Sequence, residues 1–85
     1  MIGRTESGFE FDVDDKSLDD YELLEDLAEI ADGNEGKVVS VFTRLLGSEQ
    51  KNKLKEHVRN DAGKVSASGM TKELLNIFNI LKGKN

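Results

Sequence analysis

Apolar residues recur at helical spacing through most of this chain after residue 18, and this pattern constrains the fold more than any other feature. The clearest case lies in residues 38–46, whose apolar positions are Val38, Val41, Phe42, Leu45 and Leu46. This spacing predicts an amphipathic helix, and Gly47 follows it as a C-terminal cap would. A similar stripe predicts a helix from Leu18 to Ala31, with Ser17 as its N-cap and Gly33 at its end.

Two further helices are expected. The segment from Ser48 to Asn60 has only Leu54 and Val58 as strong apolar positions, so most of its circumference should face water. After a turn containing Gly63, a last helix is expected from Thr71, as its N-cap, through Leu81.

The segment "SGFEFDVDD" before these helices alternates apolar and acidic residues, which predicts a strand with one buried face. The fold class is therefore mainly α, a small single domain of about four helices with a short N-terminal β segment. The 85 residues suffice for one domain, 1–85, in which residues 1–7 and 82–85 are expected to be flexible. The predicted core is Phe9, Phe11, Tyr21, Leu24, Leu27, Val38, Val41, Phe42, Leu45, Leu54, Val58, Leu74 and Phe78.

The composition argues against several classes of partner. A formal net charge of -5 disfavours a nucleic-acid binder, which needs clustered Lys and Arg. No apolar run approaches the roughly 20 residues that span a bilayer, and the first residues lack a secretory signal, so neither a membrane partner nor export is expected. A cytoplasmic location is the expectation. The chain contains no Cys, so thiolate chemistry is excluded.

The sequence from Val58 to Leu75 resembles that of a calcium-binding helix-loop-helix. Gly63 and Val65 fit the sixth and eighth positions of such a loop. The first, fifth and twelfth positions are Val58, Ala62 and Gly69, which have no side-chain oxygen. We therefore expect a structural turn, with no metal and no cofactor.

The other residues that could form a catalytic or binding site give no strong indication of one. Eight carboxylates lie between Asp12 and Asp26, and they are interpreted as a solvated helix face, with an acidic docking surface as the alternative. His57 is the only histidine and is expected to be a surface side chain without a nucleophile partner. No catalytic residues are predicted, and an enzyme is not expected.

Basic residues gather in one segment of the acidic chain, at Lys51, Lys53, Lys55 and Arg59. An ordinary solvated helix face explains them. The alternative is head-to-tail self-association, in which the acidic N-terminal part of one copy meets this basic stripe in the next.

The last predicted helix is unusually apolar. Seven of its twelve residues from Met70 to Leu81 are apolar, more than a one-sided stripe requires. The candidate partner-binding residues are Met70, Leu75, Ile77 and Ile80. If Ile77 points inward with its neighbours, Leu75 and Ile80 fall on the flanks of the core face and can contact a partner. The alternative is a thin core that wraps this helix on both sides.

Three successive segments carry a resemblance to a known family: "SGFEFDVDDKSLDDYELLEDLAEI", "VVSVFTRLLG" and "SEQKNKLKEHVRNDAGKVSASGMTKELLNIF". From about Ser7 to Leu81 the chain resembles the small tail assembly chaperones of long-tailed bacteriophages of Gram-positive hosts. Relatives often carry a Pro near the loop where this chain has Ser66 and Ala67.

The resemblance implies a non-enzymatic function. Such proteins bind the long, helical tape measure protein in the host cytoplasm, keep it soluble before the tail tube polymerises, and are absent from the mature virion. Two alternatives stay open: an acidic phage or mobile-element inhibitor that mimics nucleic acid, and an unassigned protein-interaction domain.

Overall fold

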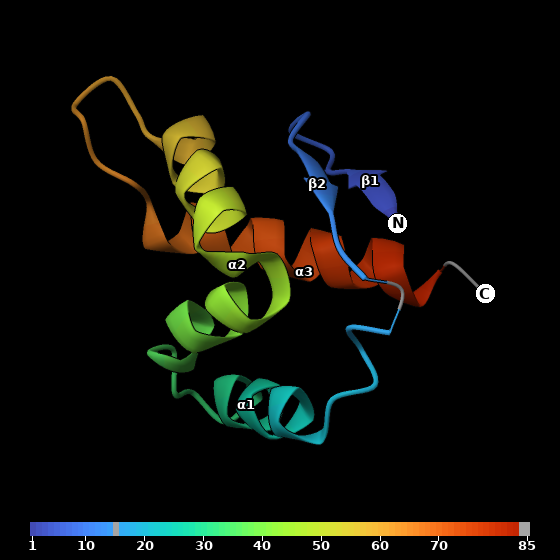
Figure 1. Cartoon of the computed structure of the whole chain (residues 1–85). Helices are drawn as coiled ribbons and strands as arrows, with labels where there is room; N and C mark the ends of the chain where they lie inside the picture. Colours follow the sequence, from blue (N-terminus) through green and yellow to red (C-terminus); the bar gives the residue numbers. More distant parts are fainter. Residues whose placement is uncertain (15, 84–85) are drawn as a thin grey trace.

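Three helices and a two-stranded sheet form the part of the chain that the computed structural model describes, residues 1–14 and 16–83 (Figure 1). The elements in chain order are β1 (Ile2–Arg4), β2 (Glu10–Asp12), α1 (Tyr21–Ala31), α2 (Lys37–Val58) and α3 (Ala67–Lys82). The mainly α class is confirmed. The predicted number of helices is wrong, because there are three rather than four.

The N-terminal residues form an antiparallel hairpin. β1 pairs with β2 so that Gly3 lies opposite Phe11, and the Phe11 ring covers Gly3 so closely that a Cβ there would lie 2.5 Å from it. Residues 1–7, which we expected to be flexible, thus include a paired strand. At the other end, α3 extends to Lys82 and Gly83 caps it, whereas residues 84–85 lie outside the described residues.

Helix α1 begins later than the sequence indicated and turns a different face to the core. Its N-cap is Asp20, whose Oδ1 accepts a hydrogen bond from the Leu23 backbone N–H (3.2 Å), rather than Ser17. Leu23 is buried, whereas Tyr21 and Leu24 are 75% and 52% exposed. The prediction that Tyr21 and Leu24 belong to the core is therefore wrong.

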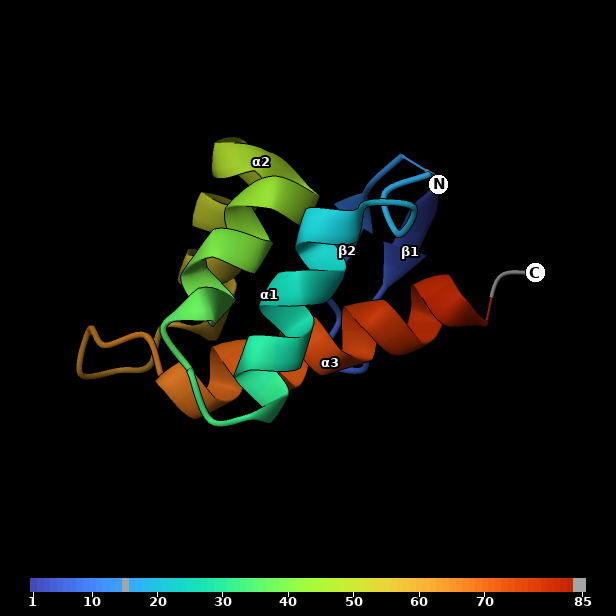
Figure 2. The same ribbon diagram turned by 90° about the horizontal axis from the view of Figure 1, so that it is seen from below.

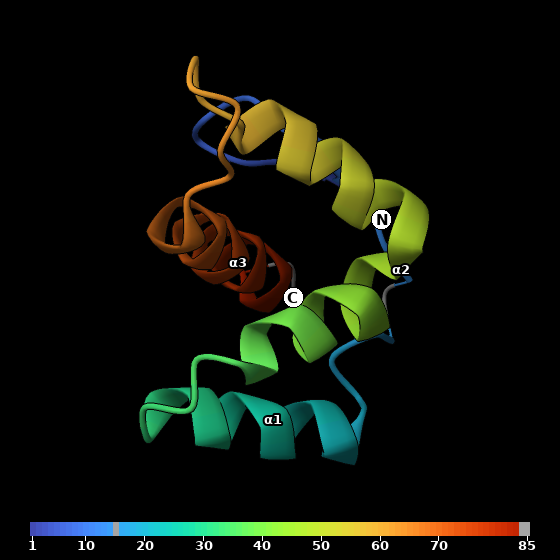
Figure 3. The ribbon, with the colours of Figure 1, turned by 90° about the vertical axis from the view of Figure 1, so that its left-hand side faces the viewer.

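Helix α2 contains both segments that we predicted as separate helices. Gly47 lies between them with φ 78° and ψ 164°, values that are not helical, and the axis bends sharply there (Figure 3). The sequence located the break correctly. However, the second segment follows directly as the other half of a kinked helix, so Gly47 redirects α2 rather than ending it.

Replacing Gly47 by Ala should lower the free energy of unfolding by about 1 to 3 kcal/mol, because only glycine adopts this backbone region without strain. Gly36 is the matched control, since its φ of -60° and ψ of -24° suit any residue. Gly36→Ala should leave the stability unchanged or raise it by less than about 1 kcal/mol. Thermal denaturation of both variants measures the difference, and equal melting temperatures would contradict the strain at Gly47.

Helix α3 starts five residues earlier than predicted. Ser66, rather than Thr71, is the N-cap, and its Oγ accepts a hydrogen bond from the Gly69 N–H (3.0 Å). The Thr71 hydroxyl instead donates to the Ala67 carbonyl within the helix (3.1 Å). The earlier start brings Met70 into the first turn of α3.

The core lies around α2, which contacts α1, α3 and β2. Helix α1 packs along the first half of α2, and the hairpin packs near α3 (Figure 2). Of the predicted core, Leu27 and Val58 are only partly buried. Buried apolar residues that the prediction omitted are Val13, Leu23, Leu46, Ile77 and Leu81.

Candidate functional site

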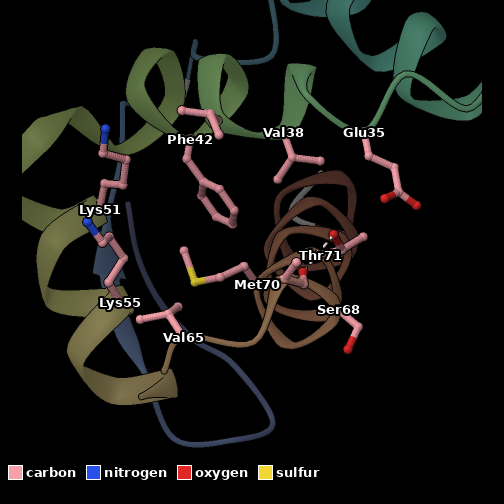
Figure 4. A pocket seen from close by; sticks show the side chains of 11 residues that line it. Glu35, Val38, Phe42, Lys51, Lys55, Val65, Ser68, Met70 and Thr71 are labelled. Atoms are coloured by element: carbon pink, nitrogen blue, oxygen red, sulfur yellow. Dashed lines mark hydrogen bonds between the residues drawn. The ribbon is translucent and has the colours of Figure 1, made fainter. Parts of the chain in front are cut away.

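An apolar groove of about 640 Å³ lies between α2 and the start of α3. We call it the α2–α3 groove. Figure 4 shows the Phe42 ring and the Met70 side chain facing each other across it, with Val38 and Val65 beside them. Val39 also lines the groove and is 63% exposed. The groove is therefore an open, mainly apolar surface that water covers in the isolated chain.

The kink in α2 and the following loop together shape this groove. Gly47 turns the second half of α2 so that Lys51 and Lys55 line the groove that begins at Phe42. The loop after α2 then places Val65 in the lining of the same groove. Its turn is held by Asn60, whose Oδ1 accepts hydrogen bonds from the backbone N–H groups of residues 62 (2.9 Å) and 64 (3.0 Å). Asn60 is the third position of the calcium-loop register considered above, and its side-chain oxygen is thus engaged in closing a turn.

The groove has opposite charges on its two sides. Lys51 and Lys55 lie on one side and Glu35 on the other, with Phe42 and Met70 between them (Figure 4). The Lys51 amino group is oriented by a hydrogen bond that it donates to a threonine hydroxyl on the preceding turns of α2 (3.0 Å). A segment with an acidic side or an acidic end is therefore favoured next to the lysines.

The predicted basic stripe is divided by the structure. Lys53 makes an ion pair with Glu49 (3.5 Å) and lies outside the groove. Arg59 donates hydrogen bonds to Glu56, the shortest of them 2.6 Å, and one to the carbonyl of the loop residue Gly63 (2.7 Å). The hydrogen bond from Arg59 lowers the pKa of Glu56 below its ordinary value and raises the pKa of Arg59. Arg59 therefore stabilises the loop locally.

The four candidate partner-binding residues do not form one surface. Met70 is partly buried and lines the groove, whereas Leu75 is 58% exposed and lies near His57 on another side of α3. Ile80 is partly buried against the core. Leu75 and Ile80 are about 140° apart around the helix, at about 100° per residue. Ile77 is completely buried in the core of the isolated chain, so it is not part of an exposed surface there.

Val39 and Phe42 belong to the groove but were not among the predicted contact residues. Phe42 was predicted only as core, and Val39 lies next to the buried Val38 without matching the apolar stripe. An exposed apolar residue beside such a stripe was the only indication in the sequence. It could not identify the groove, because the opposite wall comes from Val65 and Met70, more than twenty residues further along the chain.

Apart from the groove, the structure contains a polar cluster of Ser7, His57 and Glu73. Ser7 Oγ donates to Glu73 Oε1 (2.8 Å) and lies 3.0 Å from His57 Nε2. A serine hydroxyl has one hydrogen, so when Glu73 receives it, the imidazole must be the donor to Ser7. In a Ser–His–acid triad the imidazole instead accepts the serine proton, and the carboxylate binds the other ring nitrogen. The cluster therefore lacks the geometry of an activated nucleophile.

This cluster has a structural consequence. Glu73 is buried, and its Oε1 also accepts a hydrogen bond from the buried Thr5 hydroxyl (2.9 Å). The His57 ring packs at a tilt against Phe9, with ring centroids 5.7 Å apart. The cluster thus connects the hairpin to the end of α2 and to the first half of α3. No local pattern could predict it, because its members are far apart in the sequence.

The acidic segment is partly neutralised within the fold. Arg44 makes ion pairs with Asp20 (3.5 Å) and Glu22 (3.7 Å), while Lys37 makes ion pairs with Asp26 (3.7 Å) and Glu29 (3.5 Å). These four carboxylates attach α1 to the first half of α2. Within residues 1–14 and 16–83, no group of three or more His, Asp or Glu side chains is arranged to hold a metal ion.

The α2–α3 groove is thus the site with the most evident capacity for binding, through apolar contact and two lysines. Across the described part of the chain, none of the helices combines the length and the apolar character needed to cross a membrane. No protein-family model, no curated protein and no solved structure matches the chain.

Proposed function

We propose that this protein is a non-enzymatic tail assembly chaperone of a long-tailed bacteriophage. It binds the tape measure protein in the cytoplasm of the bacterial host, keeps it soluble during tail assembly and leaves before the virion is complete. The observation that carries the proposal is the open apolar groove between α2 and α3, lined by Val39, Phe42 and Met70. The sequence resemblance to such chaperones supports it independently.

The groove suits the recognition of an amphipathic helix. Such a helix binds by placing its apolar face in a hydrophobic groove, and Met70 can adapt to side chains of different shapes because its thioether chain is unbranched and flexible. A long apolar helix would aggregate in water unless other proteins covered it. Several copies of a small protein that is acidic on its outer surface would keep such a helix in solution.

The ion pairs of α1 make mimicry of nucleic acid the weaker alternative. A mimic needs an array of free carboxylates on one surface, but Asp20, Glu22, Asp26 and Glu29 are paired with Arg44 or Lys37. The lysines of the groove would further repel a protein that binds nucleic acid through a basic surface.

Co-expression with the tape measure protein of the same genome tests the proposed function. The soluble fraction of the tape measure protein should rise several-fold with the parent chain. Val39→Asp should abolish most of this rise, because it places a charge in the groove at a residue whose exposure spares the fold. Leu75→Asp changes the exposed candidate contact residue that lies outside the groove, and it should act like the parent if the groove is the binding surface. Equal soluble fractions with and without the parent chain would contradict the proposed function.

A further inference from the structure

Helix α1 carries a second unpartnered apolar surface. Its inward face includes Leu23, but Tyr21 and Leu24 are largely exposed, and Ala28 and Ala31 are exposed as well. At about 100° per residue these four exposed side chains fall within about 80° of one another around the helix. We call them the outer stripe of α1. Because Tyr21 and Leu24 belong to this stripe, the sequence pattern predicted the wrong face of α1 as the core face.

Carboxylates border the outer stripe on one side. Glu25 and Asp32 lie next to it, about 20° to 40° beyond Tyr21 around the helix, and both are exposed. Neither takes part in an ion pair within residues 1–14 and 16–83, unlike Glu22 and Glu29, which pair with α2. The outer stripe is therefore an apolar helix face with free negative charge along one border.

The α2–α3 groove has the complementary properties. It is apolar between Val39, Phe42 and Met70, and Lys51 and Lys55 line one of its sides (Figure 4). We propose that the outer stripe of α1 of one copy docks in the α2–α3 groove of a second copy. The apolar side chains of the stripe then cover the exposed groove, and the carboxylates beside the stripe meet the two lysines.

The groove and the stripe of the same copy cannot meet. Helix α1 packs on one side of the first half of α2, whereas α3 and the second half of α2 lie on the other side (Figure 3). The outer stripe faces away from α2, since Leu23 and the buried Asp26 face it. Each copy therefore uses two different surfaces, and such a head-to-tail contact produces a ring or an open chain of copies.

This self-association goes beyond the tape measure function and does not depend on it. Because a helix of the tape measure protein would enter the same groove, it would compete with the outer stripe of the neighbouring copy. Self-association would then cover the apolar groove until that partner is synthesised.

A charge-reversal pair tests the contact by analytical ultracentrifugation of the full chain. One variant carries Glu25→Lys with Asp32→Lys, and the other carries Lys51→Glu with Lys55→Glu. Each alone should associate at least about tenfold more weakly than the parent, since like charges then face each other. An equimolar mixture should associate again, because every stripe then finds a groove of opposite charge. Circular dichroism verifies that both variants stay folded.

Two substitutions of apolar residues in the proposed contact, with one control outside it, test whether association uses these two surfaces. Leu24→Ser and Val39→Ser should each weaken association, whereas Leu75→Ser, an equally exposed leucine outside both surfaces, should not. A parent chain that stays monomeric at millimolar concentration would overturn the proposal, as would a mixture of the charge variants that stays dissociated. The co-expression experiment gives a separate result. A chain that does not self-associate but still solubilises the tape measure protein would contradict this proposal and support the proposed function.

Discussion

Replacing Phe42 by Ala should lower the free energy of unfolding by about 3 to 5 kcal/mol. The ring is almost completely buried in the first half of α2, where it belongs to the common core and closes the inner side of the groove. Truncation would remove the contacts that the ring makes between α2 and α3. A loss of this size is a large share of the 5 to 15 kcal/mol typical of whole domains.

Urea denaturation of Phe42→Ala measures this loss, and Val39→Ala is the matched control one helical turn away. Val39 lines the same groove but is 63% exposed, so its truncation should change stability by less than about 0.5 kcal/mol. Equal midpoints for Phe42→Ala and the parent would show that the ring is not part of the core. A small effect of Val39→Ala would also show that substitutions at Val39 change the groove without unfolding the protein, so binding can be tested there.

The strongest helical pattern gave the most accurate prediction. Val41, Phe42 and Leu45 are buried as their spacing indicated, because this half of α2 is covered by α1 on one side and α3 on another. Gly47 was predicted as a helix end. Its conformation breaks the helical geometry there, but a local pattern cannot show that the chain continues as a helix in a new direction.

The prediction failed for α1 because that helix has two apolar faces. Counting Asp26 as solvent-facing favoured the stripe of Tyr21 and Leu24. The structure buries Asp26 instead, where the Ser40 hydroxyl donates a hydrogen bond to it (3.2 Å) and Lys37 pairs with it (3.7 Å). Both partners belong to α2, so the sequence of α1 alone could not reveal which face is inside.

The candidate site could be predicted only in part, for a related reason. Met70 was identified as a contact residue from the excess of apolar positions in α3, and it does line the groove. The groove itself arises from the kink at Gly47 and from the loop that returns Val65 to α2. Strand β1 was missed because Ile2 is exposed and Gly3 has no side chain, so its pairing with β2 leaves no alternating pattern.

Replacing Ile77 by Ala should lower the free energy of unfolding by about 2 to 5 kcal/mol, because Ile77 is completely buried in the middle of α3. Leu75→Ala on the same helix is the matched control, and its effect should stay below about 0.5 kcal/mol, since Leu75 is 58% exposed. Chemical denaturation of the two variants compares them directly. If Leu75→Ala were the more damaging change, α3 would have to be rotated from its position in the structure. The observed orientation would then no longer place Met70 in the groove, since Met70, Ile77 and Leu75 are fixed relative to one another by the helix.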